Sequence, residues 1–245
     1  NGNNPIIGQT SYKMTIAAKI IQGQFMAARN AEIVAEEVHS PFTLDMFSKA
    51  LIGKVTLADQ ESIITKSYTD LTVDEIIVED GGSSQLNIHH PNSSLQIRTK
   101  TNASLSVDCR RCKTKLNGTS TSDVVLDTAE VHIGQSPGSL TVEGDFSMTH
   151  NTQLYMELGG TDTADYDSLI VEGQSTLNGE LIVELYGGYQ PELNDSFTLF
   201  TLSNRIDTFH SISLPDLNDG FSWDISALYE SSDNGLAAGS IKVVA

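Results

Sequence analysis

The chain has 245 residues, with 32 Asp or Glu against 14 Lys or Arg, and its formal net charge is −18 at pH 7. Such a charge repels nucleic acids and anionic membranes, so we expect neither DNA nor RNA as a partner. No apolar run approaches the roughly 18 residues that a membrane-spanning helix needs, and we therefore expect no membrane insertion.

The composition and the first residues predict an exported protein. Ser, Thr, Asn, Asp and Gly are abundant, and lysine is sparse. The chain starts "NGNNP" without an initiator Met, which fits either a removed signal peptide or excision from a longer protein. We expect an extracellular or cell-surface location.

Residues 1–50 form an N-terminal cap or the first coils of a repeating fold. The stretch "MTIAAKIIQGQFMAARNAEIVAEEV" (14–38) fits an Ala-rich helix with one apolar face, but also strands in which apolar residues alternate. Its part "NAEIVAEEV" (30–38) is similar to "NASLSV" (102–107), which favours strands. Four apolar residues further on would close the end of such a fold: Phe42, Leu44, Met46 and Phe47.

Residues 51–135 alternate apolar and polar side chains, as strands with one buried face do. Three similar segments occur here, and their leucines lie nine and ten residues apart. The segments are "SSQLNI" (83–88), "SSLQI" (93–97) and "NASLSV" (102–107). Two such units would make one coil of about 20 residues in a β-solenoid, with coils stacked about 4.8 Å apart. A sandwich meander is the alternative, but Asn-Gly hairpin signals are rare.

Residues 136–245 carry a recognisable order of motifs. A Ser-Pro-Gly turn and strand (136–142) precede "LYMELGG" (154–160), Tyr166-Asp167 before "LIV", and "TLNGELIVEL" (176–185). A Pro191 turn then leads into "DSFTLF" (195–200), Phe209, Leu214-Pro215 and the single Trp223. This region resembles the C-terminal part of bacterial autotransporter-like, passenger-type parallel β-helix surface proteins. The resemblance implies an all-β, right-handed parallel β-helix from an exported bacterial protein that serves as stalk, scaffold or adhesin.

An aromatic-rich cap is expected at the end of this region. Glycines and prolines fall where the backbone must turn, so the apolar residues between them can point inward. The cap would consist of Phe197, Leu199, Phe209, Leu214, Phe221 and Trp223.

Cys109 and Cys112 form the motif "CRRC". In an exported protein we expect a small disulfide loop, ahead of free thiols. A redox dithiol needs a thioredoxin-like setting, which the sequence does not show. A zinc site would need further ligands, and no second CxxC occurs.

The loop "GGTDTADYD" (159–167) gathers Asp162, Asp165 and Asp167. Carboxylate oxygens between glycines are suitable ligands for calcium, but the EF-hand pattern and the nonapeptide calcium repeat are missing. A solvated turn is the preferred interpretation, with calcium as the alternative, and we expect no other cofactor.

The scarce basic residues concentrate around positions 98–115. The group consists of Arg98, Lys100, Arg110, Arg111, Lys113 and Lys115. It is the one place where an anionic glycan could dock. The preferred interpretation is that these basic residues locally offset the negative charge of the rest of the chain.

The sequence therefore predicts a non-catalytic structural or adhesive protein of a bacterial surface. A rigid β-solenoid would form a stalk, filament or matrix, and it would self-associate head to tail or by strand addition. The alternative is a β-helix that binds or cleaves a cell-surface or matrix polysaccharide. Catalysis of that kind needs paired carboxylates, or a basic residue beside an acid, on neighbouring coils, and the scarcity of basic residues argues against an enzyme.

Overall fold

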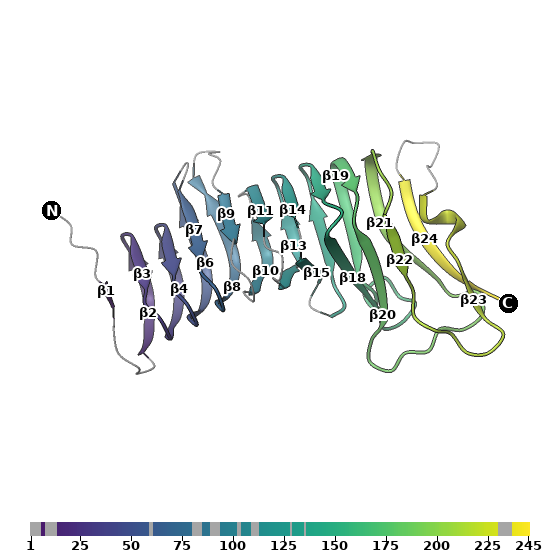
Figure 1. Cartoon of the computed structure of the whole chain (residues 1–245), viewed down its shortest axis with the longest axis horizontal. Coiled ribbons are helices and arrows are strands. Elements are labelled where there is room, and N and C mark those ends of the chain that lie inside the picture. Colours follow the sequence, from purple (N-terminus) through teal and green to yellow (C-terminus); the bar gives the residue numbers. More distant parts are fainter. Residues whose placement is uncertain are drawn as a thin grey trace.

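The molecule is an elongated stack of β-strands (Figure 1). The computed structural model describes residues 6–7, 14–58, 61–79, 85–88, 94–101, 104–108, 113–127, 129–134, 136–229 and 237–245. These residues form no α-helix, and the prediction of an all-β protein is confirmed. Accordingly, no described helix is long and apolar enough to cross a bilayer.

The longest ladder contains only parallel pairs, and each strand adjoins the corresponding strand of the next coil. In order, its strands are β2 (Met14–Gln22), β4 (Ala31–His39), β6 (Lys49–Leu57), β8 (Asp70–Val78), β10 (Ser94–Thr101), β12 (Lys113–Leu116), β15 (Ala129–Ile133), β18 (Thr152–Leu158), β20 (Glu180–Leu185) and β22 (Ser211–Ser213).

A second parallel ladder forms another side of the stack. It contains β1 (Ile6–Ile7), β3 (Phe25–Ala27), β5 (Phe42–Leu44), β7 (Ser62–Thr65), β9 (Gln85–Ile88), β11 (Ser104–Asp108), β14 (Val124–Asp127), β17 (Phe146–Met148) and the last residues of β19 (Ser168–Leu177). β5 has a parallel neighbour on each side, so Phe42 and Leu44 lie inside the stack.

A third side appears where the long strands bend. The second half of β10 pairs with β13 (Gly118–Ser120), followed by β16 (Ser139–Val142), β19 and β21 (Ser196–Arg205). Each later coil therefore has three strands, whereas the sequence predicted two. The Asn-Gly pair at 117–118 forms the corner between β12 and β13 and closes no hairpin, since these two described strands pair with other coils.

The register explains the leucine repeat. Leu86 of β9 pairs with Leu105 of β11, whereas Leu95 of β10 pairs with Leu71 of β8 in the other ladder. Two repeat units thus make one circuit of the backbone, as the spacing predicted.

The segment 14–38 is extended and not helical. Ala31, Ile33 and Ala35 of β4 point inward and are buried, while Val34 between them is exposed. The alternation of apolar residues therefore prevails over the helix propensity of alanine, because an inward apolar column is covered by the next coil.

The stack ends in antiparallel strands. β24 (Ala237–Val244) runs antiparallel to β21 and also to β23 (Ser222–Asp224), which makes the sheet mixed. The 3-10 turn η2 (Ser226–Tyr229) packs on β24 as well. Together β23 and η2 cover the outer edge of β24, which would otherwise be open to strand addition.

The predicted aromatic residues gather at this end. Phe197 is fully buried, and its ring centroid lies 5.5 Å from that of Tyr166 and 6.0 Å from that of Trp223. The Trp223 indole N–H donates to the Pro215 carbonyl oxygen at 2.8 Å. Leu199 and Phe209 are also buried, and Leu214 packs against the core, whereas Phe221 is half-buried.

Candidate functional site

Four of the residues singled out from the sequence, Cys109, Arg110, Arg111 and Cys112, lie outside the described residues. The disulfide loop therefore stays a prediction. Arg98 and Lys100 belong to β10, whose register is irregular between Ile97 and Lys100 at the bend of the strand.

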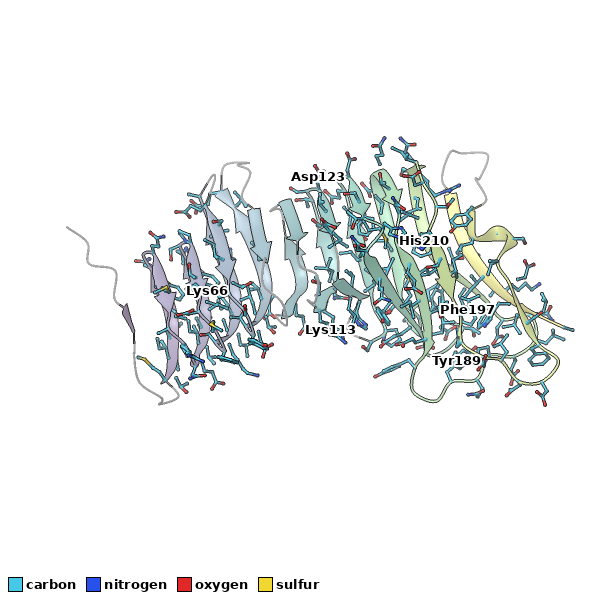
Figure 2. All side chains as sticks on the ribbon, in the orientation of Figure 1. Lys66, Lys113, Asp123, Tyr189, Phe197 and His210 are labelled. Carbon is cyan, nitrogen blue, oxygen red and sulfur yellow. The ribbon has the colours of Figure 1, made fainter. Side chains whose placement is uncertain are left out.

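Lys113 and Lys115 lie on the outward face of β12 and are both engaged (Figure 2, Lys113 labelled). The Lys113 Nζ is 2.5 Å from Glu130 Oε1, and His132 Nε2 donates to the same oxygen at 2.7 Å. The Lys115 Nζ donates to Ser136 Oγ at 3.1 Å. Lys113 thus faces a carboxylate of the adjacent coil, as local charge balance would require, whereas the hydrogen-bond partner of Lys115 is a neutral hydroxyl.

The three aspartates of the 159–167 loop have different surroundings. Asp162 and Asp165 are exposed, and the Asp165 N–H donates to the Asp162 carbonyl oxygen at 2.8 Å. Asp167 is only 1% exposed and accepts hydrogen bonds from the Gly138 N–H at 2.7 Å and the Glu157 N–H at 2.8 Å. Within the described ranges, no three His, Cys, Asp or Glu side chains are arranged to hold a metal ion. Calcium binding by this loop stays a prediction.

The structure brings Lys115 and Asp167, from two separate candidate groups, into one electrostatic neighbourhood. We call this neighbourhood the polar cluster. It consists of Lys113, Lys115, Glu130, His132, Ser136, Tyr155, Glu157 and Asp167. It lies where the outward faces of β12, β15 and β18 meet the corner at Ser136.

The register of the longest ladder creates the polar cluster. Lys115 pairs with His132, and His132 pairs with Tyr155, so the three side chains form an outward column across three coils. The rings of His132 and Tyr155 stack with centroids 4.6 Å apart and planes 12° apart. Outward alternation within each segment was visible in the sequence, but the alignment of the three coils was not.

Burial and hydrogen bonding set the charges of the polar cluster. Burial by itself raises the pKa of Glu130, but hydrogen bonds from Lys113 and His132 outweigh it and hold that pKa below its usual value. Burial lowers the pKa of His132 and outweighs its hydrogen bond to Glu130. The imidazole is therefore neutral at pH 7, and its contact with Glu130 is a hydrogen bond between a neutral donor and a carboxylate.

Asp167 is the most strongly shifted group of the polar cluster. Burial raises its pKa to about 7, although its backbone hydrogen bonds and the Lys115 charge act in the opposite direction. The nearby Glu157 charge adds to the increase. The Glu157 Oε2 is buried and has no hydrogen-bond partner among the described residues. The polar cluster thus offers hydrogen-bond acceptors and cations to a hydroxylated or anionic ligand. Most of its groups already form hydrogen bonds or ion pairs with one another.

A second surface feature follows the corner between the second ladder and the longest one. Phe47 and Tyr68 occupy equivalent positions in two successive coils, and their rings stack with centroids 5.0 Å apart. The Arg29 guanidinium lies 5.1 Å from the centroid of the Phe47 ring. We call Arg29, Phe47 and Tyr68 the corner stack. It places aromatic and basic groups on consecutive coils, which the sequence had not indicated.

Comparisons with known proteins add no family to these observations. No protein-family model matches the chain, and no curated protein matches it significantly.

Proposed function

We propose that the chain is a right-handed parallel β-helix that serves as a rigid, non-catalytic scaffold on the outside of a bacterial cell. The observation that carries this proposal is the parallel ladder that runs without interruption from β2 to β22. Its backbone hydrogen bonds run along the length of the molecule, so bending the stack would break many of them together. The right-handed sense is supported by the strong preference for right-handed connections between parallel strands.

The side chains suit a long solvated rod. Inward columns such as Ala35, Ile52 and Val73 are buried at successive coils. One outward column alternates in charge through Glu32, Lys49 and Asp70, and the Lys49 Nζ lies 2.8 Å from Asp70 Oδ2 in the adjacent coil. The resemblance of residues 136–245 to passenger-type surface proteins supports an exported stalk, filament or matrix component.

We further propose that the rod self-associates through β2. In the described residues β2 pairs only with β4, and Ile16 and Ala18 are half-buried although the residues paired with them, Ile33 and Ala35, are buried. Addition of a strand from a second copy would cover this edge.

Small-angle scattering and electron microscopy of the purified protein test both parts of the proposal. We expect an elongated particle that forms longer assemblies as concentration rises. Ile16→Lys should reduce the assemblies, because the charge would be buried at the joint, while Ile206→Lys, at an exposed position near the other end, should not. A globular particle would refute the scaffold, whereas rods that associate equally in both variants would refute only the joint at β2.

Glycan binding is the second candidate function, and the polar cluster is the observation that favours it. Lys113 and Lys115 would face an acidic sugar, and Tyr155 would lie beside it. Binding of anionic polysaccharides should weaken in Lys115→Ala and persist in Thr72→Ala, which alters the same outward column away from the polar cluster. Equal binding by both variants would exclude the polar cluster as the site.

A further inference from the structure

His150 and His210 come from separate corners of the stack and meet at its surface. His150 lies in the turn between β17 and β18, and His210 directly precedes β22. Their ring centroids are 4.2 Å apart with planes tilted by 42°, and both residues are exposed (Figure 2, His210 labelled). We call these two residues the histidine pair.

Gly179 explains why two such distant residues are in contact. The His210 N–H donates to the Gly179 carbonyl oxygen at 2.7 Å. A Cβ added to Gly179 would lie 2.4 Å from the Thr152 carbonyl oxygen and 3.0 Å from that of Thr149, so the glycine packs closely against the turn that carries His150. The absent side chain at position 179 leaves room for Met148 Cε and for the backbone of the turn that carries His150, so backbone contacts fix the two corners relative to each other.

We propose that the histidine pair binds a divalent transition metal ion such as Zn²⁺ or Ni²⁺. Neutral imidazole is a preferred ligand of these ions. Two imidazoles that share one metal through nitrogens at about 2.0–2.1 Å place their ring centroids roughly 5 Å apart. The observed separation of 4.2 Å is close to this value, and exposed side chains can rotate to bring one nitrogen of each ring to a common point.

A metal ion at the histidine pair would exchange readily with solvent, unlike one in a structural zinc site with four protein ligands. Among the described residues the histidine pair supplies two ligands, and water would occupy the remaining positions of the ion. Binding would connect the turn before β18 with the segment before β22, and so would stabilise the part of the stack next to the cap. This inference is independent of the proposed scaffold function.

Titration of the full chain with ZnCl₂ and NiCl₂ tests the proposal, with any affinity tag removed. Calorimetry should show one ion per chain in the tightest class of sites, and the melting temperature should rise with metal. His150→Ala and His210→Ala should each weaken this site roughly tenfold or more, because a second ligand on the same scaffold multiplies affinity. His39→Ala removes an exposed histidine that contacts Glu37 elsewhere in the stack, and it should leave the affinity unchanged.

Equal affinity in the wild type and in the His150→Ala/His210→Ala double variant would overturn the proposal. So would single variants that each bind like the wild type, since that result shows independent imidazoles. Melting temperatures in EDTA show whether the variants are folded. Paramagnetic Ni²⁺ added to the wild-type protein gives a readout without substitutions: the ring signals of both histidines should broaden together, and broadening of neither or of only one would refute a shared site.

Discussion

At the scale of single residues, the protonation of Asp167 should make the stability of the chain depend on pH. Its carboxyl group is buried, and both oxygens accept backbone N–H groups from Gly138 and Glu157. Burial raises its pKa from the ordinary 3.8 to about 7. The folded chain therefore holds a proton at Asp167 over a pH range in which the unfolded chain has released it.

This difference fixes the sign of the pH dependence. Between about pH 4 and 7 the folded state binds more protons at Asp167, so the free energy of unfolding should fall as pH rises, by up to about 1.4 kcal/mol per pH unit. The stabilisation is fully present below about pH 4 and is lost as pH rises through 7. Asp167→Asn should remove this slope, and urea unfolding at several pH values in the range would measure it.

Asp162→Asn is the matched control for this prediction. Asp162 belongs to the same loop but is exposed, so its replacement should leave the slope as in the wild type. An identical pH dependence in Asp167→Asn and the wild type would show that another group titrates in this range.

At the scale of elements, the corner stack combines an unfavourable backbone conformation with favourable contacts between its side chains. Phe47 and Tyr68 have φ angles of +61° and +60°, a left-handed conformation that favours glycine or asparagine. Asn30 holds the same conformation in the preceding coil, where the residue type suits it. Ring stacking and the Arg29 contact offset the cost at Phe47, each by roughly 0.5–1.5 kcal/mol.

Substitutions at Phe47 separate these two energies. Phe47→Ala should lower the free energy of unfolding, because it loses both ring contacts and keeps the strained backbone. Phe47→Gly loses the same contacts but relieves the backbone, so it should be more stable than Phe47→Ala by roughly 1 kcal/mol. Denaturant unfolding of the two variants measures the difference.

Met46 supplies the control, since it precedes Phe47 and its φ is not positive. There Met46→Gly should be less stable than Met46→Ala, the reverse of the order at Phe47. The same order at both positions would contradict the proposed strain.

The elements also show how far a sequence can predict this fold. The alternation of apolar and polar residues predicted the strands. The spacing of the leucines predicted the length of one circuit of the backbone, which pairs Leu86 with Leu105. The third side was missed because the bends of β4 and β8 fall within "VAEEV" and "VDEII", which contain no Gly or Pro, so that Gly53 and Gly173 at the bends of β6 and β19 did not stand out as a repeated signal. A bend in a continuous strand needs only a change of which side chains face inward, so it does not require a turn residue in every coil.

At the scale of the whole molecule, the functional candidates depend on coils that the sequence does not align. Lys115, His132 and Tyr155 meet only when three coils of unequal length are stacked in register. The histidine pair likewise needs the corner at Gly179 between its two members. The spacing of these residues along the chain predicts neither the outward column nor the histidine pair. The sequence therefore presented their members as unrelated residues.

The whole stack is closed at one end by a reversal of strand direction, and this closure should control its solubility. Ile241 of β24 is fully buried, pairs with Phe197 of β21, and belongs to the strand that covers the last parallel edge. Ile241→Lys would bury a charge there and detach β24, which exposes the edge of β21 and the aromatic core. We expect a lower melting temperature and more aggregation than in the wild type at the same concentration, measured by light scattering after gel filtration.

Lys242→Ile is the control for the cap, because it alters the exposed neighbour on the same strand and keeps the inward face unchanged. It should show the same light-scattering profile and the same melting temperature as the wild type at equal concentration. Parallel strands present the same edge at every coil, so a chain built from them has no intrinsic end, and an antiparallel strand covered by β23 and η2 supplies one. Light scattering and a melting temperature of Ile241→Lys equal to those of the wild type would show that the reversal at β24 is not what terminates the stack.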